Sequence, residues 1–218
     1  MTDLSQLSLT RYRINFAKTA AMRFTSHLDL HRTWERTLRR AGLPLAYSHG
    51  FNPHPKINLA SALPLGFTSE GEVVDVWLEN EIPLQQVTHA MIVAAPPGLK
   101  INQVQQVEEH APTLQKVLEA SEYVITFLEP FPLLNERLEE ILSAGSLPRE
   151  RRGKAYDLRP LILEARRLAD DEQGHARLFV RMIAQEGATG RPEEVVDALG
   201  AVPGETLVHR KGLVFRIE

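Results

Sequence analysis

Cysteine is absent from all 218 residues of the chain. Disulfides, thiolate metal sites, cysteine-ligated iron–sulfur clusters and cysteine nucleophiles are therefore excluded. No run of about 18 apolar residues occurs that would span a membrane, and the first ten residues, MTDLSQLSLT, lack the basic and apolar regions of a secretory signal. These absences predict a soluble, cytoplasmic protein without a membrane partner, and the lack of cysteine fits a reducing compartment.

Nucleotide-binding and hydrolase motifs are missing as well. The chain contains no Gly-x-x-x-x-Gly-Lys-Ser/Thr loop and no Gly-x-Gly-x-x-Gly turn after a strand. Ser26 and Ser48 have neither a nucleophile elbow nor an obvious base partner. Nucleotide-driven chemistry and serine hydrolysis therefore have no support, and we expect no cofactor.

What the chain does contain is enough apolar material for a packed core, at 43% of residues. Its net charge of −3 hides an uneven distribution. Residues 11–56 hold nine Lys/Arg against two acidic residues, a net +7, and residues 149–167 hold seven against three, a net +4. The sequence thus predicts basic regions on an otherwise acidic body, which is the distribution expected of a protein that binds a polyanion.

Hydrophobic periodicity divides the chain into two similar halves. In the first half it predicts the order βαββαβ, with a further short strand after the first helix: strand or hairpin 11–24, helix 26–41, strands 43–48, 56–64 and 72–78, helix 83–95, strand 99–107. The second half repeats the order without a residue-level repeat: strand 122–128, helix 134–142, strands 156–164 and 177–184, helix 190–200, strand 207–217. We therefore predict an α+β fold of tandem, duplicated ferredoxin-like βαββαβ units, whose antiparallel sheets carry helices on one face. Residues 1–110 and 111–218 would form the two domains.

The first helix combines a cap, an apolar face and a basic face. Ser26 stands at the N-cap position with Asp29 three residues later, and Gly42 follows as a stop. Leu30, Trp34 and Leu38 recur at helical spacing. Four arginines fall roughly opposite them: Arg32, Arg36, Arg39 and Arg40. This face suits phosphate groups, although a solvated charged face would show the same pattern.

A stiff loop, Gly50-Phe51-Asn52-Pro53-His54-Pro55-Lys56, follows the helix. Its two prolines exclude helix and restrict the residues before them to extended shapes. Tyr47 and Phe51 would either stack on an unpaired base or anchor the loop in the core.

Two histidines, His27 and His31, lie four residues apart on the same helix. They are weak metal candidates, with His49 or His54 as further ligands. No His-Glu-x-x-His motif supports a metal, and we expect none. Asp29 and Asp157 are conceivable catalytic carboxylates, but a helix cap and an arginine partner explain them adequately.

Several motifs together resemble one family, the radical-SAM-linked protein family, a domain of unknown function found beside or fused to cobalamin-binding radical SAM proteins. The resemblance is dense over the first 80 residues, and a second block lies in the other half: Arg23-Phe24-x-Ser26-His27-Leu28-Asp29, Arg39-Arg40-Ala41-Gly42-Leu43-Pro44, Ser48-x-Gly50-Phe51-Asn52-Pro53-His54-Pro55-Lys56, Ala60-x-Ala62-Leu63-Pro64-x-Gly66, and Arg152-x-Lys154-x-x-Asp157-Leu158-Arg159-Pro160. It implies association with a radical SAM enzyme, in RNA or ribosome maturation. The chain itself lacks the Cys-x-x-x-Cys-x-x-Cys cluster motif and the Asp-x-His-x-x-Gly cobalamin loop of such an enzyme.

These observations predict a non-catalytic RNA-recognition or substrate-presenting module that acts with a radical SAM enzyme. One alternative is an RNA-modifying or RNA-cleaving enzyme that uses Asp29, His27 or His54. Another is an interaction module that binds only the radical SAM partner. The sequence leaves the oligomeric state open. The residues expected to contact RNA are Arg23, Arg32, Arg36, Arg39, Arg40, Phe51, Asn52, His54, Lys56, Arg151, Arg152, Lys154 and Arg159.

Overall fold

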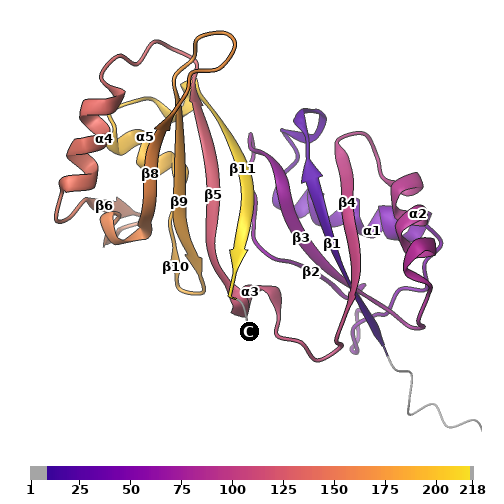
Figure 1. Cartoon of the computed structure of the whole chain (residues 1–218). Helices are drawn as coiled ribbons and strands as arrows, with labels where there is room; N and C mark the ends of the chain where they lie inside the picture. The colour runs from indigo at the N-terminus through magenta and orange to yellow at the C-terminus, as the bar shows by residue number, and fades with distance from the viewer. Residues whose placement is uncertain (1–8, 217–218) are drawn as a thin grey trace, which may run out of the picture. The chain divides into compact units, whose positions relative to one another are not determined.

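The computed structural model describes residues 9–216, which divide into two compact units with the boundary between Val117 and Leu118. Each unit combines an antiparallel sheet with helices (Figure 1). The predicted α+β class is therefore confirmed. No helix within residues 9–216 is long and apolar enough to cross a membrane.

Unit 1 follows the order β1-α1-β2-β3-α2-β4, with a 3-10 turn after β1 and a short helix at its end. Its strands pair antiparallel in the spatial order β2-β3-β1-β4. The bounds are β1 Thr10–Lys18, η1 Ala20–Met22, α1 His27–Arg40, β2 Ile57–Leu59, β3 Thr68–Leu78, α2 Leu84–Ala94, β4 Leu99–Val107 and α3 Leu114–Val117.

The core of unit 1 lies between its sheet and the helices α1 and α2. Alternate residues of β1, including Tyr12, Ile14 and Phe16, are fully buried there, because successive side chains of a strand point to opposite faces. Trp34 of α1 meets the Phe16 ring edge-on at 4.8 Å. Figure 1 shows α1 passing behind the strands of this unit, so the opposite face of the sheet carries the other alternating set.

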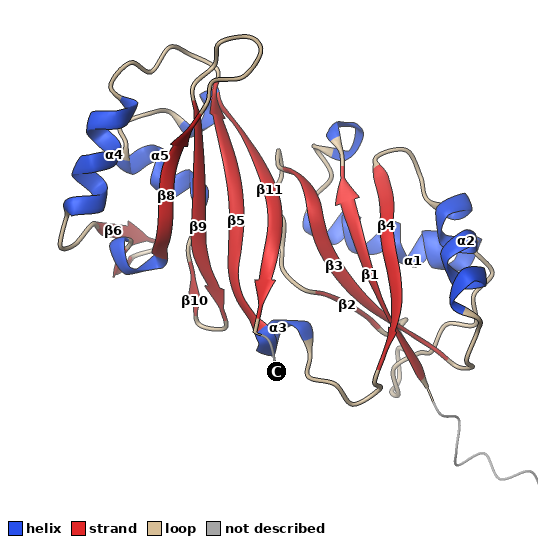
Figure 2. Cartoon of the chain, in the orientation of Figure 1, coloured by secondary structure: helices blue, strands red, loops and turns tan. Residues whose placement is uncertain are grey.

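Unit 2 contains the same type of strand arrangement with two additions. Strands β8, β9, β5 and β11 pair antiparallel in that spatial order, while the hairpin β6–β7 forms a separate two-stranded sheet and the short β10 pairs with β9. Figure 2 shows these strands in red and the helices in blue. The bounds are β5 Leu118–Phe127, α4 Leu134–Ser143, β6 Pro148–Arg151, β7 Lys154–Asp157, η2 Arg159–Leu161, β8 Ile162–Leu168, β9 Arg177–Gln185, β10 Ala188–Thr189, α5 Pro192–Ala198, η3 Pro203–Glu205 and β11 Thr206–Phe215.

Four of the predicted strands differ in the structure. The strand or hairpin predicted over 11–24 ends at Lys18 and is followed by η1, and the strand predicted over 56–64 is only β2, Ile57–Leu59. Residues 43–48 form no named strand, only isolated bridges from Leu45 to Leu78 and from Tyr47 to Pro55. Pro44 within this segment has no N–H to donate to a ladder. The strand predicted over 156–164 divides into β7, a 3-10 turn and β8, because Pro160 interrupts the extended run.

Candidate nucleic-acid interface

Helix α1 has the cap and faces that its sequence predicts. The Ser26 hydroxyl accepts a hydrogen bond from the Asp29 backbone N–H at 3.2 Å and donates to Asp29 Oδ2 at 2.7 Å. The hydrogen bond from the Ser26 side chain, followed by the hydrogen bond and charge of Arg32 and the charge of Arg36, holds the pKa of Asp29 below its ordinary value despite some desolvation. Leu30, Trp34 and Leu38 are buried, so the arginines project from the opposite side of the helix.

Most of these arginines form no ion pair. Arg32 contacts Asp29 at 3.2 Å, and both side chains are largely exposed. Arg36, Arg39 and Arg40 are exposed, and their side chains form no ion pair or hydrogen bond within residues 9–216. Three guanidiniums are therefore presented to solvent on one helical face, where they can bind phosphate oxygens bidentately.

Other cations of the basic segment have structural roles instead. Arg11 is 1% exposed and pairs with the fully buried Asp75, to which Arg13 also donates at 2.9 Å. Lys18 is fully buried and donates to the carbonyls of Arg23 and Phe67 at 3.2 and 3.1 Å. The net charge of residues 11–56 therefore overstates what this region offers to a polyanion.

The loop between α1 and β2 is closed at its base and exposed at its tip. Ser48 N–H donates to the His54 carbonyl at 2.8 Å, and the Ser48 hydroxyl accepts from His54 N–H at 3.0 Å. Phe51 at the tip is completely exposed and Tyr47 is 39% exposed. The interpretation of these aromatics as core anchors is therefore wrong, and Asn52 and His54 are exposed beside Phe51.

Lys56 lies beyond the loop, on the sheet face that α1 and α2 do not cover. Trp77 N–H donates to the Lys56 carbonyl at 3.2 Å, and Trp77 stands opposite Arg11 on the next strand. Asn58, two residues after Lys56, stands opposite Asp75. Lys56, Trp77 and Asn58 thus share one face, a grouping that rests on strand register and that the sequence did not reveal.

Arg23, which follows η1, makes one contact with the backbone and one with an exposed ring. Its Nε donates to the Gly66 carbonyl at 2.9 Å, and its guanidinium lies 5.3 Å from the exposed ring of Phe24. The Nε group of this guanidinium therefore stabilises the fold.

The second basic block belongs to unit 2 and centres on the hairpin β6–β7. Arg152 and Gly153 form its turn with positive φ values of 50° and 74°. Arg152 and Lys154 are exposed, and Arg151 is half-buried. This turn presents closely spaced cations to solvent.

Arg159 serves the fold of unit 2. Its guanidinium donates to the Leu142 carbonyl at the end of α4 and to the Ile162 carbonyl, at 3.0 to 3.2 Å. Such bonds satisfy carbonyls left open at a helix end. We therefore leave Arg159 out of the proposed RNA contacts.

Asp157 lies near Arg159 but does not pair with its guanidinium. Its Oδ1 accepts the backbone N–H groups of Leu147 and Arg159 at 2.7 and 2.9 Å. These bonds hold the pKa of Asp157 below its ordinary value. Asp157 thus fixes the loop mainly through backbone groups, and the charge of Arg159 makes a smaller contribution to its lowered pKa.

The predicted histidines do not form a metal centre. His31 Nδ1 lies 3.2 Å from Glu35 Oε1 on the next helical turn. Within the part of the chain that the structure describes, no group of three or more His, Asp or Glu side chains has the geometry to hold a metal ion.

A histidine–aspartate pair occurs in a loop of unit 2. His175 Nδ1 lies 3.0 Å from Asp171 Oδ2. Burial raises the pKa of Asp171, but hydrogen bonds from the His175 backbone and ring and from the Gln173 backbone outweigh it and leave the pKa lowered. Both residues belong to one tight turn, so this pair fixes the loop.

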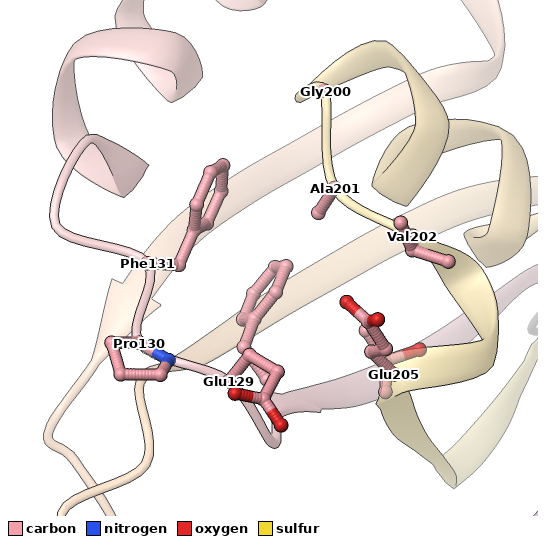
Figure 3. A pocket seen from close by; sticks show the side chains of 9 residues that line it. Glu129, Pro130, Phe131, Gly200, Ala201, Val202 and Glu205 are labelled. Atoms are coloured by element: carbon pink, nitrogen blue, oxygen red, sulfur yellow. The ribbon is translucent and has the colours of Figure 1, made fainter.

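A small cavity in unit 2 is lined by apolar and acidic side chains and has a volume of about 170 Å³. Figure 3 shows Phe131 and Pro130 on one side and the carboxylates of Glu129 and Glu205 at its lower edge. Two carboxylates and no cation line it. Such a lining disfavours a phosphate group, so this cavity is not part of the candidate interface.

Comparison with solved structures finds chains of H/ACA ribonucleoprotein complexes. A chain of a Cbf5–Nop10–Gar1 complex aligns with 11% identity and a TM-score of 0.47, covering 93% of this chain and 47% of that one. A chain of the archaeal box H/ACA Nop10–Cbf5 complex aligns with 13% identity and a TM-score of 0.42, covering 93% of this chain and 46% of that one. A chain of an H/ACA ribonucleoprotein bound to a substrate RNA aligns with 12% identity and a TM-score of 0.45, covering 93% of this chain and 45% of that one. The chain spans less than half the length of these relatives, and similarity at this level carries no conclusion about function.

No curated protein matches the sequence significantly. A family model, in contrast, matches residues 11–192, which include α1, the loop, the hairpin β6–β7 and the start of α5. The match extends over both units and most of the chain. The chain therefore belongs to the DUF2344 family, described as uncharacterized proteins conserved in bacteria.

Proposed function

We propose that this protein is a non-catalytic module that recognises RNA, or presents an RNA substrate, to a radical SAM enzyme during RNA or ribosome maturation. The observation that carries the RNA part is the exposed face of α1. The side chains of Arg36, Arg39 and Arg40 are exposed there and form no ion pair in the described part of the chain.

An unpaired arginine on a rigid helix is suited to phosphate binding. An arginine held by a carboxylate must first lose that contact, whereas these three guanidiniums are available in the free protein. Each phosphate that they neutralise releases condensed counterions, so the affinity depends steeply on salt. The fully exposed Phe51 offers a surface on which an unpaired base can stack.

The hairpin of unit 2 supplies a second set of contacts in this proposal. Arg151, Arg152 and Lys154 lie within four residues at a tight turn. A cation cluster on each unit would let the protein hold an RNA at two separate points. We expect the hairpin to contribute affinity without selecting a base.

Filter binding to structured RNA at two salt concentrations tests the RNA part. If three phosphates are contacted, raising the salt from about 50 to 200 mM should weaken binding roughly 20- to 40-fold. The double variant Arg36→Ala/Arg40→Ala should bind less tightly and show a shallower salt dependence. Arg137→Ala is the matched control, because Arg137 is also exposed on a helix but pairs with Glu140 at 2.9 Å.

The control variant should behave as the wild type. Absence of binding at low salt, or an Arg36→Ala/Arg40→Ala variant that binds as the control does, would refute RNA recognition by this helix.

The radical SAM partnership rests on the sequence resemblance of the N-terminal motifs. We propose that a radical SAM enzyme supplies the chemistry, because the chain has no cysteine to hold an iron–sulfur cluster. Co-purification from cells of a radical SAM enzyme with the tagged chain tests this partnership. If the complex survives nuclease treatment and high salt, the contact is protein–protein, and if it does not, RNA bridges the two.

We also propose that the chain is a tandem duplication of a ferredoxin-like unit. The support is the matching order of strands: β4-β1-β3-β2 in unit 1 corresponds to β11-β5-β9-β8 in unit 2. The hairpin β6–β7 would then be an insertion in the second copy. An experimental structure in which the four strands and two helices of each unit superpose would support the duplication, and different helix placements would contradict it.

A further inference from the structure

A pocket of about 480 Å³ lies on unit 1, on the sheet face opposite α1 and α2. Its lining comes from β2, the end of β3 and the segments just before β1 and after β4. The lining residues are Leu9, Lys56, Ile57, Asn58, Trp77, Glu109 and His110. The pocket thus combines an aromatic ring, an amide, a carboxylate and two basic side chains, and its volume accommodates a nucleobase.

The Trp77 ring in this pocket is held in a fixed orientation. The Arg11 guanidinium carbon lies 4.9 Å from the ring centroid. Arg11 itself is fixed by Asp75 and by the carbonyl of Pro112, at 3.0 Å in each case. Because the ring is held in advance, a base that stacks on it loses little by ordering the side chain.

Asn58, which lines the pocket, has a side-chain acceptor without a hydrogen-bond donor. Its Oδ1 is buried and has no partner among the described residues. A buried carbonyl oxygen without a donor costs free energy, which rotation of the Asn58 side chain toward a ligand N–H in the pocket would recover. Asn58 and the Glu109 carboxylate both accept hydrogen bonds, so they favour a ligand that carries an amino group.

Lys56 supplies the complementary charge, and His110 lies at the same pocket. Lys56 leads directly from the loop that carries Phe51, and the His110 side chain is exposed. A lysine ammonium group binds phosphate oxygens through charge-assisted hydrogen bonds. The pocket therefore joins a stacking surface and a base-reading amide to a place for the phosphate of the same nucleotide.

We infer that this pocket binds one amino-bearing nucleobase, adenine or cytosine, of an unpaired nucleotide in RNA. The inference rests on the proposed RNA function and adds base selection to it. The base stacks on Trp77, its exocyclic amino group donates to Asn58 Oδ1, and Lys56 contacts the adjoining phosphate. Uracil has no exocyclic amino group and should bind more weakly.

Tryptophan fluorescence provides a direct assay, since the chain has two tryptophans and Trp34 is fully buried in the core. Titrating the full chain with the hexanucleotides A6, C6 and U6 should quench the Trp77 emission, with U6 binding at least about 5-fold more weakly than A6. Asn58→Leu should weaken A6 binding roughly 2- to 10-fold and remove the preference over U6. Trp77→Phe should abolish the quenching while filter binding to A6 persists.

Three results would overturn the inference: no quenching by any hexanucleotide, unchanged base preference in Asn58→Leu, or binding of free AMP as tight as that of A6, which would make the pocket a site for free nucleotides. Filter binding to structured RNA, measured on the same samples, separates this inference from the proposed function. If RNA is retained through Arg36 and Arg40 but Trp77 is not quenched, only the pocket assignment fails. If RNA is not retained at all, the proposed function fails.

Discussion

The ion pair beneath the pocket gives a quantitative prediction about unit 1. Arg11 and Asp75 are 1% and 0% exposed, and Arg13 shares the same carboxylate at 2.9 Å. Asp75→Asn keeps the shape of the side chain but leaves the Arg11 charge buried without a counter-charge. Breaking a buried pair in this way costs about 3–5 kcal/mol, which corresponds to a fall in melting temperature on the order of 10 °C.

Thermal and chemical unfolding followed by tryptophan fluorescence measures this effect, because Trp34 and Trp77 both lie in unit 1. Arg32→Gln is the control: it breaks an ion pair whose side chains are 68% and 55% exposed. Such a pair contributes about 0–1 kcal/mol. A variant Asp75→Asn that unfolds within about 1 kcal/mol of the wild type would refute the reasoning that this carboxylate compensates a buried charge.

Two further predictions concern the backbone and pH. Gly98→Ala should destabilise unit 1, as measured by fluorescence-monitored unfolding. Gly98 has φ +94°, and an added Cβ would lie 2.4 Å from Met22 Cγ and 2.9 Å from Met22 N. An unchanged stability of the variant would contradict this clash. The pKa of Asp157 is lowered in the folded state, so its ionised form stabilises the fold at pH values above 3.8, the ordinary pKa of the carboxyl group. This stabilisation is lost as the pH falls through the lower pKa of the folded state. The difference in unfolding free energy between wild type and Asp157→Asn, measured by circular dichroism, should therefore be largest near neutral pH and shrink below about pH 4; a constant difference would contradict it.

Local signals in the sequence were sufficient for many elements. The cap at Ser26 and the buried stripe of Leu30, Trp34 and Leu38 follow from residue type and spacing, and α1 has both. The hairpin β6–β7 was missed because its turn, Arg152-Gly153, places a non-glycine residue at positive φ. The usual sequence signal for such a turn is Asn-Gly or Asp-Gly.

The candidate interface was only partly accessible to sequence reasoning. Side-chain type identifies cations, but burial decides which of them are available: Lys18 is fully buried and Arg11 nearly so, whereas Arg36 is exposed. The proximity of Lys56, Trp77 and His110 depends on strand register and on the path of the segment after β4. Neither is a local property of the chain.

Ultraviolet crosslinking of bound RNA, with the crosslinked residues identified by mass spectrometry, tests the central claim most directly, because it locates the RNA on the chain. The account predicts crosslinks in α1 and the loop that follows it, residues 27–56, at the hairpin turn, residues 151–154, and at Trp77 in the pocket of unit 1. Crosslinks confined to other segments, such as the acidic cavity around Glu129 and Glu205, or no crosslinks above background, would contradict it.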